Sequence, residues 1–247
     1  MTWLFVFFFL SGFCSILYEL IWLRLAMAEY GVTTALVSIV LSVFMAGLGA
    51  GSWIAGTAVR RYGDRIKFPP LRLYALSELV IGISALLVPV QLAYGNHLLE
   101  RMASHITVSS GAYYAASGAW LSLSLIPWCA FMGATIPLAM FAISHDARYQ
   151  SGRSFSFLYL SNVLGAVAGA ILPLFLIELY GFRATLRVGA LVNILIFMSA
   201  LFLTFVSPGA LRRPHRRRAI GSLLALRLAR LPWFFFSPPA SPPWAWR

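Results

Sequence analysis

The sequence is dominated by long apolar runs separated by short polar segments. Six runs are long enough to cross a bilayer as helices, and they cover residues 3–25, 34–59, 73–95, 113–143, 155–178 and 184–206. A helix needs about 20 apolar residues to cross about 30 Å of hydrocarbon at about 1.5 Å per residue. The sequence therefore predicts an all-α fold, a polytopic membrane bundle of six transmembrane helices over residues 1–206.

Two of the runs have special features. The fourth run is long for one crossing and contains Pro127 and Pro137, so we expect a kink, a tilt or an interfacial first turn there. The first run lacks a basic segment before it and continues past the length of a signal peptide. We therefore expect it to be retained as the first transmembrane helix.

Composition excludes other classes of protein. Of the 247 residues, 60% are hydrophobic, 15% are aromatic and only 11% are charged. A soluble domain has about a quarter of its residues charged, and a disordered chain would be poor in aromatic residues. A transmembrane β-barrel would instead show short segments of alternating polarity. A helical membrane protein remains.

The distribution of charge predicts the orientation of the bundle. Four arginines fall on one side, and they are Arg24, Arg101, Arg183 and Arg187. Twelve basic residues fall on the other side, and they are Arg60, Arg61, Arg65, Lys67, Arg72, Arg148, Arg153, Arg212, Arg213, Arg216, Arg217 and Arg218. Because cytoplasmic loops carry the excess of basic residues, we expect both termini in the cytoplasm of a bacterial-type inner membrane.

The tail, residues 207–247, differs from the rest of the chain. It holds eight arginines, seven prolines and no acidic residue. Its first part is typical of a basic helix on an anionic membrane surface, and its last part has no pattern that forms a core. Because out-of-frame reading of GC-rich DNA yields Arg, Pro, Ala and Trp, a tail that is partly a frameshift product is the alternative. The excess of basic residues lies mostly here and in the loops, so it does not indicate a nucleic-acid partner.

Ionisable residues inside a membrane helix are costly and are therefore candidate functional residues. Glu19 lies about 24 Å from the cytoplasmic face by the helical rise. Its candidate partners at that depth are Arg24 and Arg187, and a contact with either would seal the outer end of the bundle. A binding site for a cation or an amine at Glu19 is the alternative.

A second polar group is predicted nearer the cytoplasm. Glu78 and Asn162 lie at similar depth, about 10 Å from the cytoplasmic face, and Tyr159 is grouped with them. They are interpreted either as hydrogen-bonding residues that join helices or as a ligand site. Since Glu19 lies at the other end of the bundle, Glu19 and Glu78 are not expected to form a paired-carboxylate site.

Small residues predict close helix contacts, and no catalytic or metal-binding motif is evident. Gly47 and Gly51 are four residues apart, as are Gly165 and Gly169, a spacing that lets helix backbones approach closely. Neither pair follows a strand, so neither indicates a nucleotide loop. The four histidines lack metal-ligand spacing, no catalytic triad is evident, and we predict no cofactor. Cys14 and Cys129 lie inside apolar runs, where no disulfide is expected.

Five ordered motifs resemble a known family. They are SGFCSILYELIWLRL at 11–25, VFMAGLGAGSWIAG at 43–56, LRLYALSELVIGISALL at 71–87, MGATIPL at 132–138 and LYLSNVLGAVAGAILPLFLIELYGFRAT at 158–185. Together they resemble the membrane domain of fused spermidine-synthase-like proteins over about residues 3–206. The matching positions are Tyr18, Glu19, Trp22, Arg24, Gly47, Gly51, Glu78, Gly133, Pro137, Tyr159, Asn162, Gly165, Gly169 and Gly181.

The resemblance implies a membrane-anchoring or binding function in polyamine biosynthesis. In that family the membrane helices precede a cytosolic Rossmann-like domain that transfers an aminopropyl group from decarboxylated S-adenosylmethionine to putrescine. Such a domain needs a glycine-rich loop after a strand and acidic residues, and the tail offers neither. We therefore expect no catalytic domain in this chain, and a cytoplasmic aminopropyltransferase domain or subunit is the implied partner besides the lipid bilayer.

Two other interpretations stay open. The segment WIAGTAVRRYGDR at 53–65 is loosely similar to the loop after the second helix of major-facilitator transporters. Six helices would be half of such a transporter, which would then work as a homodimer and move polyamines or other cations. An inactive truncated product is the third interpretation.

Overall fold

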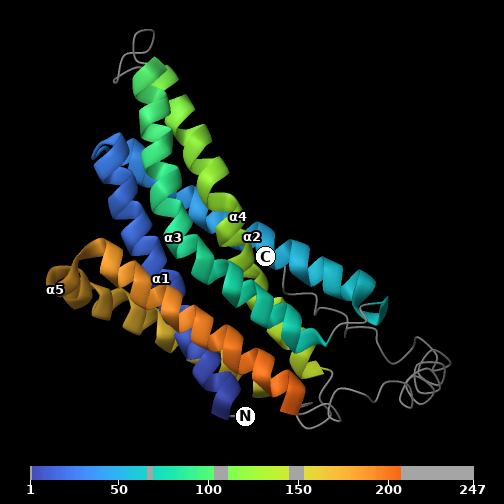
Figure 1. Cartoon of the computed structure of the whole chain (residues 1–247). Helices are drawn as coiled ribbons and strands as arrows, with labels where there is room; N and C mark the ends of the chain where they lie inside the picture. The colour runs from blue at the N-terminus through green and yellow to red at the C-terminus, as the bar shows by residue number, and fades with distance from the viewer. Residues whose placement is uncertain (1, 66–68, 103–110, 145–152, 207–247) are drawn as a thin grey trace, which may run out of the picture. The chain divides into compact units, whose positions relative to one another are not determined.

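The structure, a computed structural model, describes residues 2–65, 69–102, 111–144 and 153–206. Within these ranges it consists of five α-helices and one 3-10 turn, with no strand (Figure 1). The helices are α1 (Thr2–Tyr30), α2 (Thr34–Tyr62), α3 (Pro70–Met102), α4 (Gly111–Ser144) and α5 (Arg153–Val206), and the turn is η1 (Gly63–Arg65). Each of the five helices contains a segment long and apolar enough to cross a membrane. For the described residues, the prediction of an all-helical fold with helices long and apolar enough to span a membrane is confirmed.

The sequence predicted six separate helices, and the described residues instead form five. The difference lies in α5, a single element of 54 residues that contains both of the predicted runs 155–178 and 184–206. Its backbone leaves helical geometry only at Gly181, where φ is 77° and ψ is 172°. A positive φ is readily adopted by glycine and costly for other residues, so glycine permits the break. Below, residues 153–180 are called the first arm and residues 182–206 the second arm.

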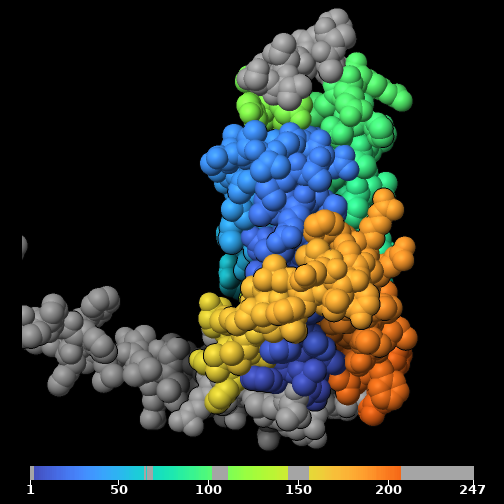
Figure 2. Space-filling model, turned by 90° about the vertical axis from the view of Figure 1, so that its left-hand side faces the viewer, coloured from blue at the N-terminus to red at the C-terminus, as the bar shows by residue number. Residues whose placement is uncertain are grey.

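The chain reverses direction at Gly181. Along the first arm, Ser161 donates a hydrogen bond to the carbonyl of Phe5, and Gly169 lies against the carbonyl of Phe13, so this arm runs parallel to α1. Along the second arm, Gly189 contacts the Tyr18 ring, whereas Ala200 packs in a cluster with residues near the start of α1. The second arm is therefore antiparallel to α1. Figure 2 shows α5, in yellow to orange, beside the dark blue first part of α1.

A tight turn joins α1 to α2. Gly31, with a φ of 104°, donates a hydrogen bond from its backbone nitrogen to the carbonyl of Met27, which closes the last turn of α1. Thr33 then caps α2, because its hydroxyl accepts a hydrogen bond of 3.3 Å from the nitrogen of Leu36. The two helices are thus separated by only three residues, and α2 returns along the bundle.

The small residues of α2 lie against α4. A Cβ atom added at Gly51 would lie 1.9 Å from the carbonyl oxygen of Ala130, and one at Gly47 would lie 2.5 Å from the Cβ of Cys129. On the opposing helix, a Cβ at Gly133 would lie 2.0 Å from the carbonyl oxygen of Leu48. The two backbones therefore touch within one chain, and α4 runs as a helix through both of its prolines, Pro127 and Pro137.

A second close contact joins α1 to the first arm of α5. A Cβ at Gly165 would lie 1.9 Å from the carbonyl oxygen of Phe9, and one at Gly169 would lie 2.4 Å from that of Phe13. On α1, a Cβ at Gly12 would lie 2.2 Å from the carbonyl oxygen of Asn162. Because lipid provides no hydrophobic driving force between helices, such contacts replace it with dispersion between closely packed backbones.

The interior of the bundle is formed mainly by one aromatic and aliphatic cluster. Tyr18 and Trp22 of α1 are fully buried and stack with ring centroids 5.5 Å apart, and Phe44 of α2 packs edge-on against Trp22. Around them lie buried residues from all five helices. The outer surfaces carry many exposed leucine, valine and phenylalanine side chains, as expected for helices that face lipid.

Several predictions concern residues outside the described ranges. They include the nature of the tail, residues 207–247, and the loop positions Lys67 and Arg148.

Candidate functional site

A buried hydrogen-bonded cluster lies where α1, α3 and the second arm of α5 meet. The Ser11 hydroxyl donates to Oε1 of Glu78 at 2.8 Å, and Nδ2 of Asn193 donates to Oε2 at 2.7 Å. The Tyr18 hydroxyl in turn donates to Oδ1 of Asn193 at 2.6 Å. Tyr18, Glu78 and Asn193 have no exposed surface, and Ser11 has 5%. Together with Tyr74, these residues are called the Glu78 cluster.

Helical spacing explains why these residues meet. Ser11 and Tyr18 are seven residues apart, which places both on one face of α1. Gly189 and Asn193 are four residues apart on the second arm, so the Tyr18 ring crosses the arm at Gly189 before its hydroxyl reaches Asn193. Glu78 projects from α3 between these two elements. One carboxyl group thus ties three segments together that are far apart in sequence.

The cluster contains one hydroxyl, that of Tyr74, which forms no hydrogen bond of good geometry with the residues that the structure describes. Tyr74 lies one turn before Glu78 on α3, is fully buried, and stacks on Phe8 with ring centroids 6.0 Å apart. Burying a hydroxyl without a hydrogen bond is unfavourable, and the Tyr74 hydroxyl lies close enough to the Glu78 carboxyl and the Ser11 hydroxyl to interact with both.

The Glu78 carboxyl also has no basic partner among the described residues. Within the described ranges the only ion pair is the exposed one between His97 and Glu100, so no arginine pairs with Glu78. Its two hydrogen-bond donors, a hydroxyl and an amide, are neutral. A carboxylate here would be stabilised by dipoles alone, which makes Glu78 a candidate functional residue.

The pairing predicted for Glu19 does not form. Glu19 is half-buried, whereas Arg24 and Arg187 are exposed, and neither arginine makes an ion pair with it in the described part of the chain. Arg24 is five residues from Glu19 and therefore points away around the helix. Glu19 also lies eight residues beyond Ser11 on α1, about 12 Å along the axis, and has no hydrogen bond to the Glu78 cluster.

The structure gives Glu78 hydrogen-bond partners other than Asn162 and Tyr159, with which the sequence grouped it. Asn162 lies on the first arm of α5, where its backbone and side chain pack over Gly12 of α1. Tyr159, on the same arm, is 54% exposed. The partner of Glu78 is instead Asn193 on the second arm, because the reversal at Gly181 brings that arm against α1 and α3.

Sequence reasoning missed Ser11 and Asn193. Asn193 stands alone in the run LVNILIF, and an isolated amide inside a membrane helix is itself a signal, because its cost must be offset by a partner. Ser11 carries a weaker signal, since serine hydroxyls in helices often bond to their own backbone. What the sequence did not reveal is which side chains of the two arms face α1 and α3.

Other site chemistry is absent from the described residues. Among them, no group of three or more His, Cys, Asp or Glu side chains is placed to hold a metal ion, and the buried Cys14 and Cys129 are not joined to each other. The fold and the cluster define a multi-pass helical membrane protein with a buried polar site. Comparisons with protein-family models, with curated proteins and with solved structures find no match.

Proposed function

We propose that this chain is the membrane domain of a spermidine-synthase-like protein, which anchors or binds an aminopropyltransferase at a bacterial-type inner membrane. In this proposal α1 to α4 cross the membrane once each and the two arms of α5 cross it in opposite directions. Six crossings result, with both termini in the cytoplasm. The excess of basic residues in the loop after α2 supports this orientation.

The observation that carries the proposal is the position of the motif residues. Tyr18, Trp22 and Glu78 are fully buried in the bundle. The motif glycines lie at the two backbone contacts, and they are Gly47, Gly51, Gly133, Gly165 and Gly169. Motifs from five separated segments thus take part in one pattern of packing, which supports a shared domain over chance similarity of apolar sequence.

Copurification of enzyme activity tests the proposed function. We expect the tagged chain, purified in mild detergent from the membranes of its own host, to carry aminopropyl transfer from decarboxylated S-adenosylmethionine to putrescine. That activity should exceed, by at least about tenfold, the activity recovered from the same cells with an untagged chain. A folded, tagged chain without measurable transfer would contradict an anchoring function.

The two-arm topology of α5 predicts where engineered cysteines are accessible. After removal of Cys14 and Cys129, a cysteine at Tyr180 should react with a membrane-impermeant maleimide from outside, as should one at Val32. Both side chains are exposed, at 66% and 81%. A cysteine at Arg65 should react only after the membrane is opened. If the cysteine at Tyr180 reacts only from inside, or not at all, the sixth crossing is wrong.

A second candidate function is transport of polyamine-like cations by a dimer. The Glu78 carboxyl, buried without a basic partner among the described residues, favours it, because an organic cation would supply the missing charge. If the chain is a transporter, vesicles that contain the purified chain should take up putrescine. Glu78→Gln or Glu19→Gln should then reduce uptake at least tenfold, whereas Glu100→Gln, an exposed control, should not. Uptake that is unaffected by both changes would remove this candidate.

A further inference from the structure

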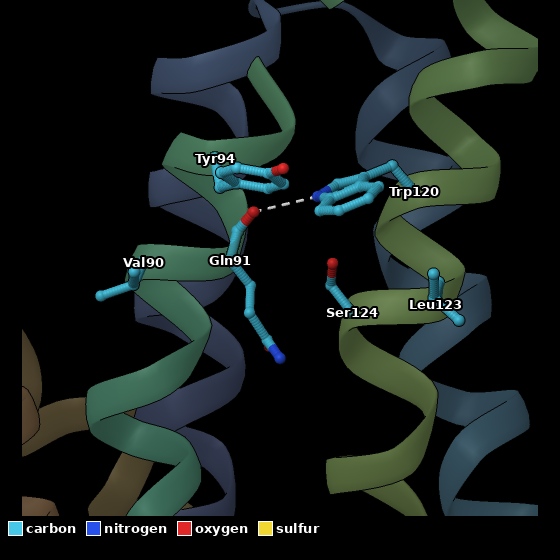
Figure 3. A pocket seen from close by; sticks show the side chains of 6 residues that line it. All are labelled: Val90, Gln91, Tyr94, Trp120, Leu123 and Ser124. Atoms are coloured by element: carbon cyan, nitrogen blue, oxygen red, sulfur yellow. Dashed lines mark hydrogen bonds between the residues drawn. The ribbon is translucent and has the colours of Figure 1, made fainter. Parts of the chain in front are cut away.

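Two adjoining hollows lie on the outer face of the bundle between α3 and α4. One, of about 280 Å³, is lined by Val90, Gln91, Tyr94, Trp120, Leu123 and Ser124. The other, of about 260 Å³, shares Trp120 and Leu123 with the first and extends toward Gly95 and Ala119. They therefore form one groove along two helices. Figure 3 shows the first hollow, with side chains from both helices facing it.

The groove contains a hydroxyl group without a partner. Ser124 is only 4% exposed, and its oxygen points into the space between Gln91 and Trp120 (Figure 3). It makes no hydrogen bond with the residues that the structure describes. Two other serines of α4, Ser117 and Ser122, instead donate to the carbonyl groups four residues earlier in the helix. The Ser124 hydroxyl is thus free to donate to an oxygen atom in the groove.

The neighbouring polar groups are arranged as donors. The backbone oxygen of Gln91 accepts from Nε1 of Trp120 at 2.9 Å, and its side-chain oxygen accepts from Nε1 of Trp128 at 3.0 Å. Both acceptors of Gln91 are therefore used, which leaves its amide hydrogens and the Ser124 hydroxyl to face a ligand. No Asp, Glu, His, Lys or Arg side chain lines either hollow, so the complementary ligand group is a neutral acceptor oxygen.

The groove also carries the aromatic side chains that are typical of a bilayer interface. Tyr94 and Trp120 lie beside each other, with ring centroids 5.8 Å apart. Tyr30, the last residue of α1, donates a hydrogen bond from its hydroxyl to the carbonyl of Leu92 in α3. Tyrosine and tryptophan concentrate where hydrocarbon meets the headgroups of a bilayer. Ser124 is one turn deeper than Trp120, about 6 Å along α4. With Trp120 at the interface, Ser124 would lie at the depth of the ester carbonyl groups of a phospholipid.

We propose that this groove binds one phospholipid, with an ester carbonyl accepting from Ser124 and Gln91 and an acyl chain lying along Trp120 and Leu123. The width of the groove argues for a lipid over a second copy of the chain. A helix with its side chains is about 10–12 Å across, too wide to enter hollows of this size, whereas an acyl chain is one methylene wide. Val90 and Leu123, 65% and 67% exposed, form walls open to the bilayer. The proposal depends only on a membrane location, not on the proposed anchoring function.

Native mass spectrometry of the full chain in mild detergent tests this site. Phosphatidylglycerol with ester-linked chains is titrated against the wild-type protein and three variants. The first, Ala119→Trp, fills the second hollow and should abolish one lipid-binding event. The second, Ser124→Ala, should weaken that event by about three- to tenfold, the value of one hydrogen bond. The control Ser122→Ala should bind as the wild type does, because that hydroxyl bonds within its own helix.

An ether-linked phospholipid, which lacks the carbonyl groups, provides the second measurement. It should bind the wild-type protein no more tightly than the ester lipid binds Ser124→Ala, because both the Ser124 and the Gln91 hydrogen bonds are lost, and it should bind the wild type and Ser124→Ala equally. Equal lipid binding by all four proteins, each verified as folded by its circular dichroism, would overturn the proposal. A change in the dimer fraction of Ala119→Trp with unchanged lipid binding would also overturn it, in favour of a second copy.

Discussion

Replacement of Gly51 by leucine is expected to disrupt the contact between α2 and α4. A Cβ at this position alone would lie 1.9 Å from the carbonyl oxygen of Ala130 and 2.5 Å from its Cα, which are backbone atoms that no rotamer change can move. The two helices would have to separate along their shared face. We expect a loss of about 3 kcal/mol or more of unfolding free energy, at or above the upper end of the usual cost of overpacking.

Gly49 provides the matched control for this experiment. It lies two residues earlier on α2, and a Cβ there has open space around it. Gly49→Leu should therefore leave stability unchanged or raise it slightly, because glycine is a poorer helix former than leucine. Unfolding by sodium dodecyl sulfate in mixed micelles, followed by circular dichroism, compares the two variants. Equal stability of both would mean that α2 and α4 do not touch at Gly51.

Replacement of Glu78 by leucine is expected to loosen the second arm of α5. Leucine is similar in size but accepts no hydrogen bond, so the Asn193 amide and the Ser11 hydroxyl would both lose their acceptor. Ser11 can turn to its own helix backbone, whereas Asn193 is fully buried on an arm with no substitute among the cluster residues. A buried donor without a partner costs about 1–3 kcal/mol, and we expect a loss near 2 kcal/mol.

Glu78→Gln separates this structural effect from the effect of charge. Its amide oxygen can accept from Asn193, and its amide nitrogen can donate to the Ser11 hydroxyl, so we expect stability within about 1 kcal/mol of the wild type. The same unfolding measurement applies to both variants. A leucine variant as stable as the glutamine variant would show that the hydrogen bonds of Glu78 do not hold the arm in place.

Parts of this architecture were predictable because they depend on local sequence alone. The spacing of Gly47 with Gly51, and of Gly165 with Gly169, indicated two faces that backbones can approach, since a missing side chain is a property of the residue itself. The partner of each face was not predictable. Ala130 of α4 and Phe9 of α1 are ordinary apolar residues, and nothing in the sequence distinguishes them from others exposed to lipid.

The buried polar groups were likewise predictable from the sequence only in part. The free-energy cost of placing Glu78 in an apolar run could be inferred from the sequence, because a carboxyl group is unfavourable in lipid wherever its partners lie. Helical depth then suggested Asn162, which is at the right level but on the other arm of α5. Depth along the bundle does not determine which side chains face each other, because the rotation of each helix depends on every helix that packs against it.

The sequence by itself determined that this is an all-helical protein with membrane-spanning segments, because hydrocarbon admits only long apolar helices whose backbone groups are satisfied internally. It also determined where small and polar residues interrupt those helices. Only the tertiary structure decided that the reversal between the last two runs falls at Gly181, that Asn193 and Ser11 hold Glu78, and that Ser124 faces a groove. The reason is physical: apolarity and helical periodicity are local, whereas the choice of neighbouring helix depends on side-chain packing throughout the bundle.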